Sequence, residues 1–143
     1  MQIDLYAVYK YDKNKQVLEW IGEKRFGISG IAETGLNWDK LRPSRSLPQH
    51  VRRIYGSVQL VVIQAFNRHD KDSITQWDRV VLVIRGKWVS YTSDFQVEST
   101  GLGRWVSALI TGKNKYKTRI MVTYRPNVRG NSATVSSQHE RYF

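Results

Sequence analysis

The sequence predicts a domain that combines helices and strands, α/β in the broad sense and α+β in the narrow one. We expect a mixed, largely antiparallel sheet with helices on one face. Apolar runs of strand length recur along the chain and end at Gly, Pro or Asn, which predicts several short strands. In the first half these runs alternate with helical spacing, whereas in the second half short turns containing glycine join them, as in hairpins. At 143 residues, we expect residues 1–143 to form a single domain.

The first part of the chain is predicted to run strand, helix, strand. Ile3–Tyr9 is apolar and aromatic, which favours a strand. Val17–Ile21 has apolar residues at helical spacing, and Gly27 follows at a place where a left-handed residue often ends a helix. Ile28–Ala32 is a second apolar run of strand length. This order is typical of a crossover unit with parallel strands.

A second helix and a third strand are predicted between residues 46 and 66. Ser46–Gln49 has the spacing of a capping box, which indicates a helix start. Apolar residues between 51 and 55 supply one face of this helix, and Gly56 ends it. Val58–Phe66 is strand-like, and we expect a polar loop after it over Asn67–Ser73.

The second half of the chain is predicted to hold two hairpins. Each consists of two apolar runs around a short turn that contains glycine and lysine: Trp77–Ile84 with Trp88–Thr92, and Trp105–Ile110 with Thr118–Tyr124. Hairpin strands pair antiparallel, so this part of the sheet is expected to be antiparallel.

The chain is strongly basic, and its charge is uneven. Twenty-three Lys and Arg against twelve Asp and Glu give a net charge of +11. Eight of the basic residues, opposed only by Glu140, fall between Arg104 and Phe143. This asymmetry favours a polyanionic partner, and we expect nucleic acid, either DNA or RNA. A solvated basic face with no specific partner is the alternative.

Cysteine content and hydropathy exclude several kinds of site and several cellular locations. The chain has no cysteine, which excludes disulfides and thiolate metal sites and leaves metals with oxygen ligands. No apolar run approaches the length of a membrane span, and the first ten residues lack the order of a signal peptide. We therefore expect no membrane partner and an intracellular protein, cytoplasmic or nuclear.

The stretch before Pro126 reads as an apolar strand that ends in polar residues. Ile120–Thr123 favours a buried, extended backbone, and the proline prevents this strand from continuing in a paired interior. Tyr124, Arg125 and Asn127 then offer a phenol, a guanidinium and an amide, which can all donate hydrogen bonds to a phosphate. The alternative is a strand that leaves its sheet through an ordinary Pro-Asn turn.

Glu33 is the candidate metal ligand. It ends the apolar run Ile28–Ala32, where an acid at a sheet edge could hold a hard cation. Mg2+ takes few carboxylates, keeps several waters and completes its shell with phosphate oxygens of a substrate. The alternative for a lone glutamate in this place is a solvated acid at the end of a strand.

Two dipeptides place a cation beside an indole. Arg104-Trp105 and Lys87-Trp88 would suit stacking on bases or on the sugar-phosphate backbone. The alternative for both tryptophans is packing in the core or between layers.

Four blocks of sequence resemble the endonuclease/exonuclease/phosphatase family. The first is Gly30–Trp38, with the sequence Gly-Ile-Ala-Glu-Thr-Gly-Leu-Asn-Trp. The others are Gly86–Val89, Leu102–Trp105 and Val122–Asn127, in the order and at roughly the intervals that family members show. The resemblance covers about Gly30 to Phe143 and is closest to divergent, retroelement-associated members, in which the metal-binding glutamate is followed by Thr, a residue and Leu-Asn-Trp.

The resemblance implies roles for these residues. Glu33 and Tyr124 would be catalytic residues: Glu33 would be the ligand of Mg2+ or Mn2+, and Tyr124 would contact the scissile phosphate. Asn127 would place the nucleic-acid backbone. We assign Arg125 and Arg104 to substrate binding beside them. Family members are hydrolases in which one or two divalent ions activate water and stabilise the charge that develops on the phosphate.

The sequence also departs from the family. Its 143 residues lack the Gly-Asp-Phe-Asn and Ser-Asp-His blocks, which carry catalytic aspartates and the histidine that activates water. The family's early asparagine has no clear counterpart, although Asn14 lies a little beyond the first predicted strand. His50, His69 and His139 are expected on the surface or in loops. We interpret the chain as the N-terminal half of such a domain, an incomplete metal-dependent phosphodiesterase or endonuclease that is inactive alone.

One half of the family's four-layer sandwich would leave an apolar sheet face exposed on the side away from the helices. We expect a homo-oligomer or a second chain to cover this face. Two other interpretations stay open: a non-catalytic, basic nucleic-acid-binding or assembly module, and a gene fragment with no selected activity.

Overall fold

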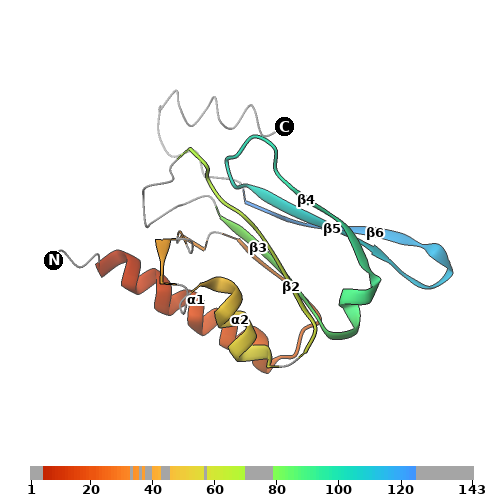
Figure 1. Ribbon diagram of the computed structural model, residues 1–143, viewed down its shortest axis with the longest axis horizontal. Coiled ribbons are helices and arrows are strands. Elements are labelled where there is room, and N and C mark those ends of the chain that lie inside the picture. The colour runs from red at the N-terminus through yellow and green to blue at the C-terminus, as the bar shows by residue number, and fades with distance from the viewer. Residues whose placement is uncertain are drawn as a thin grey trace.

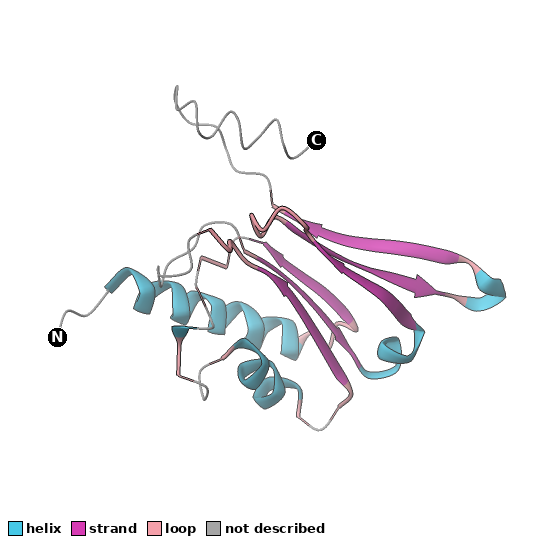
Figure 2. Cartoon of the chain, turned by 45° about the horizontal axis from the view of Figure 1, so that its top comes forward, coloured by secondary structure: helices cyan, strands magenta, loops and turns pink. Residues whose placement is uncertain are grey.

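The computed structural model has three layers: helices, a first three-stranded sheet, and a second three-stranded sheet (Figure 1). It describes residues 5–32, 34–35, 37, 40–42, 46–56, 58–69 and 79–124, and of residues 5–10 the backbone alone. The first sheet has the strand order β1-β3-β2 and the second β4-β5-β6, and every pairing is antiparallel. Figure 2 shows the two sheets from a second direction. The predicted α+β class is confirmed.

The chain opens with a long helix, α1 (Leu5–Glu23), so the strand predicted over Ile3–Tyr9 is wrong. Leu18 and Ile21, one helical turn apart, are buried against the first sheet. Packing of such a face outweighs the strand preference of a short apolar run. The helix ends earlier than predicted, because Arg25, with a φ of 55°, takes the left-handed position expected for Gly27.

The first sheet is built around β3 (Val80–Arg85), whose first five residues are all buried. β1 (Ile28–Ala32) has the predicted bounds and pairs with one edge of β3, and β2 (Leu60–Ala65) pairs with the other. The crossover unit predicted over residues 3–32 is wrong, because Leu5–Tyr9 of its first strand lies in α1, and β1 pairs instead with β3, antiparallel.

Helix α2 (Leu47–Tyr55) confirms the second predicted helix. Leu47, Val51 and Tyr55 recur every four residues and are buried beside α1 on the first sheet. Gly56 follows with a φ of 68°, as expected of a residue that ends a helix. Ser46 precedes the helix as predicted, but its side chain makes no capping hydrogen bond, so the capping box itself is wrong.

The chain passes from the first sheet to the second through η3 (Gly86–Tyr91), a 3-10 helix. The hairpin predicted around this segment is wrong, because β4 (Thr92–Val97) pairs with β5 and not with β3. The other predicted hairpin is confirmed: β5 (Trp105–Thr111) pairs with β6 (Lys117–Thr123), and η4 (Lys113–Lys115) lies in their turn.

The second sheet covers the face of the first sheet that points away from the helices. Leu82 and Ile84 from β3 pack against Val106 and Ala108 from β5 in one buried cluster. At Gly30 of β1 an added Cβ would lie 2.5 Å from Val122 Cγ2 of β6, so the absence of a side chain lets the two sheets approach closely here. The apolar face that was expected to be exposed, and to need a second copy or a second chain, is therefore buried within this chain.

Candidate nucleic-acid interface at the strand ends

Strand ends from both sheets meet at one end of the molecule, which we call the rim. Ala32 of β1 and Ala65 of β2 both lie opposite Val80 at the start of β3. In the second sheet the end of β6 lies beside the start of β5, and Arg68 N donates to Gly101 O at 2.7 Å between the loops of the two sheets. The described residues of the rim follow or precede these strands: Thr34, Asn37, Phe66–His69, Arg79, Glu98–Arg104 and Tyr124.

The rim includes the part of the predicted site that the structure describes. Tyr124 follows β6, and its backbone N–H donates to Arg104 O at 2.8 Å, so these two residues lie together. The chain neighbours of Glu33, Ala32 and Thr34, lie at the same end of the molecule, since Ala32 pairs with Val80. Glu33, Arg125 and Asn127 themselves lie outside the described residues.

Burial changes what Arg104 and Tyr124 can do. The Arg104 residue has 0% of its surface exposed, and Tyr124 is half-buried against the cluster between the sheets. A guanidinium with no accessible surface does not contact a ligand without a rearrangement, so the predicted substrate contact of Arg104 is not available in this arrangement. Arg104 is thus a structural residue of the rim as the structure stands.

Glu98 organises the turn between β4 and β5. It is 6% exposed, and its Oε2 accepts a hydrogen bond from Arg104 N at 2.6 Å, while Oε1 accepts one from Thr100 Oγ1. Gly101 and Gly103 in this turn both have a φ of 77°, which side chains rarely tolerate. Buried carboxylates need such donors, so Glu98 holds the turn that carries Arg104.

Arg79 joins the start of β3 to the segment after Glu33. It is 1% exposed, its guanidinium donates to Asn37 Oδ1 at 2.9 Å, and it lies 5.0 Å from the ring centroid of Phe66. Its carbonyl oxygen accepts a hydrogen bond from Thr34 N at 3.3 Å. From α1, Asn14 Nδ2 donates to Thr34 O at 2.5 Å. Sequence reasoning did not single out Arg79, which lies inside the predicted strand Trp77–Ile84.

Arg68 is the exposed cation among the described residues of the rim. Its guanidinium lies 6.0 Å from the centroid of the Phe66 ring, and its backbone is fixed by the bond to Gly101. His69 next to it is exposed in a loop, as predicted, with Nε2 3.1 Å from Thr100 O. Sequence reasoning placed a polar loop here but did not single out Arg68.

His50 does not join this site. His50 was expected on the surface, but it is buried in α2, where its ring nitrogen is hydrogen-bonded to Tyr11 Oη. The prediction is wrong because His50 lies on the buried face of the helix, about one turn after Leu47 and next to Val51. His139 lies outside the described residues.

The described residues do not by themselves make a metal site. Among them, no three Asp, Glu or His side chains lie close enough together to hold an ion. The carboxylate of Glu98 already accepts two hydrogen bonds within its turn. The Mg2+ or Mn2+ that the family resemblance implies therefore has no ligand set in this part of the chain, and its expected ligand, Glu33, lies outside it.

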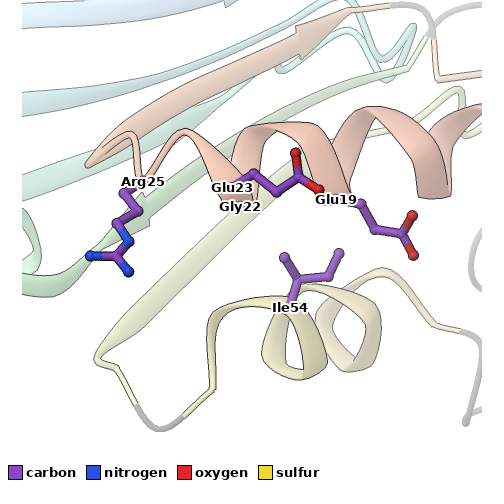
Figure 3. A pocket seen from close by; sticks show the side chains of 5 residues that line it. All are labelled: Glu19, Gly22, Glu23, Arg25 and Ile54. Carbon is purple, nitrogen blue, oxygen red and sulfur yellow. The ribbon is translucent and has the colours of Figure 1, made fainter.

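A separate hollow lies where α1 and α2 meet, on the helical face of the molecule. Figure 3 shows Ile54 from α2 pointing toward α1, with Glu19, Glu23 and Arg25 at its edges. An added Cβ at Gly22 would lie 2.2 Å from Ile54 Cγ2, so the helices touch at this glycine. Glu19 Oε1 lies 3.9 Å from Lys15 Nζ, one turn earlier in α1. The hollow mixes both charges over a packing contact, and we assign it no chemistry.

Neither the described helices nor comparisons with known proteins point to a membrane span or to a family. Within the part of the chain that the structure describes, neither helix has the length and apolar character needed to cross a bilayer. No protein-family model, curated protein or solved structure matches the chain.

Proposed function

We propose that this chain binds nucleic acid at the rim as a phosphodiesterase-like domain, and that its 143 residues do not cut nucleic acid by themselves. The observation that carries the proposal is the meeting, at one end of the molecule, of Arg68, Tyr124 and the chain neighbours of Glu33. Tyr124 and Glu33 were expected to hold a phosphodiester, and Arg68 adds an exposed guanidinium at the same end of the molecule. A cytoplasmic or nuclear location, where nucleic acid is present, belongs to the same proposal.

Charge and geometry support the binding part. The net charge of +11 attracts a polyanion at a distance, and release of counterions makes such binding favourable at low salt. Arg68 adds an accessible guanidinium that can hold a phosphate with two hydrogen bonds. The Phe66 ring beneath it and the bond from its N–H to Gly101 limit its freedom before a ligand arrives.

We predict no hydrolysis because the sequence lacks the Gly-Asp-Phe-Asn and Ser-Asp-His blocks of the family that it resembles. Phosphodiester hydrolysis needs a group that activates water and groups that stabilise the developing charge. Among the described rim residues, Glu98 is held by its turn and Arg104 is buried. We retain Mg2+ or Mn2+ at Glu33 as part of the proposal, because the family resemblance implies it, but we assign no chemical step to the ion.

A binding measurement on labelled DNA and RNA, with and without Mg2+, tests this function. We expect salt-sensitive binding, no cleavage, and a salt slope that is smaller by about one in Arg68→Ala, since one phosphate contact is lost. Lys13→Ala, an exposed cation on α1, is the matched control and should bind like the wild type. Undetectable binding at low salt, or Mg2+-dependent nicking that disappears in Glu33→Ala, would contradict the proposal.

A non-catalytic nucleic-acid-binding module is the second candidate, and the burial of Arg104 favours it. This candidate needs no metal, so Glu33→Ala should leave both the affinity and its response to Mg2+ unchanged. The assembly form of this candidate is weaker, because the sheet face that was expected to dock a partner is covered by the second sheet.

A further inference from the structure

A groove lies at the end of the strands opposite to the rim. η3 follows β3, and the turn with η4 follows β5, so both lie at the other end of these strands from Arg79 and Arg104 (Figure 1, Figure 2). β5 has seven residues, which separates its two ends by roughly 20 Å. The space between η3 and the end of β5, which we call the tip groove, has a volume of about 250 Å³ and is lined by Lys87, Trp88, Tyr91, Ile110, Thr111 and Lys113.

Two aromatic rings form one wall of the tip groove. Trp88 is 38% exposed and Tyr91 50% exposed, and their ring centroids lie 6.5 Å apart at 67°. The indole is held from behind: an added Cβ at Gly27 would lie 2.0 Å from Trp88 Cδ1. Exposed rings in a fixed place are typical of binding surfaces, because little side-chain freedom is lost when a ligand stacks on them.

The charged residues that line the tip groove are two lysines, Lys87 and Lys113. Lys115 lies in the adjacent turn and Lys117 begins β6, and residues 86–93 and 109–118 contain no Asp or Glu. Lys87 Nζ lies 5.9 Å from the Trp88 ring centroid. A ligand that fits this surface therefore has flat rings and negative charges that alternate over short distances.

We propose that the tip groove binds single-stranded nucleic acid, with bases stacked on Trp88 and Tyr91 and with backbone phosphates held by Lys87 and Lys113. Stacking platforms flanked by cations are the usual means of holding single strands, and they need an unpaired base face. The groove is smaller than the roughly 300–1,000 Å³ of pockets that enclose a whole small molecule, so it suits one flat group of a longer chain. This surface shares no residue with the rim, and the inference does not depend on the function proposed above.

The test compares a fluorescent oligothymidylate of about 12 nucleotides with an abasic strand of the same length and with duplex DNA. We expect Tyr91→Ala to weaken oligothymidylate binding by roughly 5- to 100-fold, the range for the loss of one stacked base. The abasic strand should bind wild type and Tyr91→Ala alike, because it offers phosphates without rings. Phe95→Ala removes a ring that is 43% exposed and lies outside the groove, and it should bind like the wild type.

A second variant tests the cations. The Lys87→Ala, Lys113→Ala double variant should lower the salt slope for single strands by about 1.4, at about 0.7 for each contact. Lys13→Ala is again the control. Circular dichroism confirms that each variant is folded, and Trp88 is left unchanged because it packs on Gly27.

Three outcomes overturn the inference: Tyr91→Ala binds as tightly as wild type, Phe95→Ala loses as much affinity, or the double variant keeps its salt slope. Vesicles of anionic lipid are the remaining probe. If Tyr91→Ala loses vesicle binding and keeps oligothymidylate binding, the groove is a membrane contact and the inference is wrong. If Arg68→Ala leaves the salt slope unchanged, the proposed function of the rim is overturned. The result for Tyr91→Ala does not depend on that outcome.

Discussion

The rim and the tip groove are both rich in cations and aromatic rings, but they expose them differently. At the rim, Arg79 and Arg104 are buried and the ring of Phe66 is covered in part by guanidinium groups. At the tip groove, Lys87, Trp88 and Tyr91 all reach solvent. Composition alone would make the two regions equal candidates for binding, whereas burial separates cations that support the fold from cations that are available to a ligand.

The difference has a physical cause. Burial of a charged or polar group is costly unless hydrogen-bond partners replace water. For Arg79 the rim supplies such a partner, since Asn37 Oδ1 accepts from its guanidinium, and Glu98 accepts from the backbone N–H of Arg104. At the tip, a strand turn and a 3-10 helix project from the core, and lysines there stay hydrated. Substitution of the buried rim residues should therefore change stability, whereas substitution in the tip groove, like that of the exposed Arg68, should change binding.

The largest effect is expected at Glu98. Glu98→Ala removes the acceptors of Arg104 N and Thr100 Oγ1 and should lower the free energy of unfolding by about 1–3 kcal/mol, because buried donors lose their partners. Lys113→Ala at the tip is the matched control, with an expected change within about 0.5 kcal/mol. Urea denaturation measures both. Equal losses in the two variants would remove the distinction between the two regions.

A smaller effect is expected at Gly27, which lies behind the tip groove. Gly27→Ala places a methyl group against the Trp88 indole and should lower the free energy of unfolding by about 1 kcal/mol. This value is at the low end for overpacking, because the partly exposed ring can move outward. The indole N–H resonance of Trp88 should shift. In the control Gly112→Ala, the new Cβ would lie 3.7 Å from Tyr116 O, and stability should be unchanged. An unmoved Trp88 resonance would mean that the indole does not rest on Gly27.

Elements with local signals were predicted well from the sequence. β1, α2 and the β5–β6 hairpin each have an apolar pattern bounded by a turn or a glycine, and these predictions are confirmed. The errors lie where distant parts decide the structure. The start of α1 folds as a helix because the helix that it opens packs on the first sheet, and η3 leads β3 and β4 into different sheets.

For the candidate site, the sequence indicated residues but not their exposure. Tyr124 and Arg104 were assigned to the site from separate blocks, and their backbones are hydrogen-bonded. The predicted approach of Tyr124 to Glu33 stays a prediction, since Glu33 lies outside the described residues. The burial of Arg104 depends on what covers it, and no local pattern reports this. Arg68 was missed because a polar loop gives no sign of which residue lies beside the other sheet.

The smallest predicted effect concerns Arg119, a cation that is at the surface but is already paired with a carboxylate. Arg119, on the outer face of β6, is bonded to the Asp94 carboxylate and donates to Ser107 Oγ at 3.1 Å. Its hydrogen bond, with a further one from Gln96, holds the pKa of Asp94 below its ordinary range. Arg119→Gln should raise this pKa toward the ordinary value of about 3.9, which a carboxyl NMR titration measures.

The sign of the pH effect follows from that direction. A carboxyl group whose pKa is lower in the folded state stabilises the protein above the unfolded-state pKa, and the contribution is lost as the pH falls through the folded-state pKa. Wild type should thus exceed Arg119→Gln in stability at neutral pH by a small margin, since exposed pairs are screened, and the margin should vanish in acid and shrink in high salt. A margin that persists in acid would mean that Arg119 acts through Ser107 or through packing and not through the charge of Asp94.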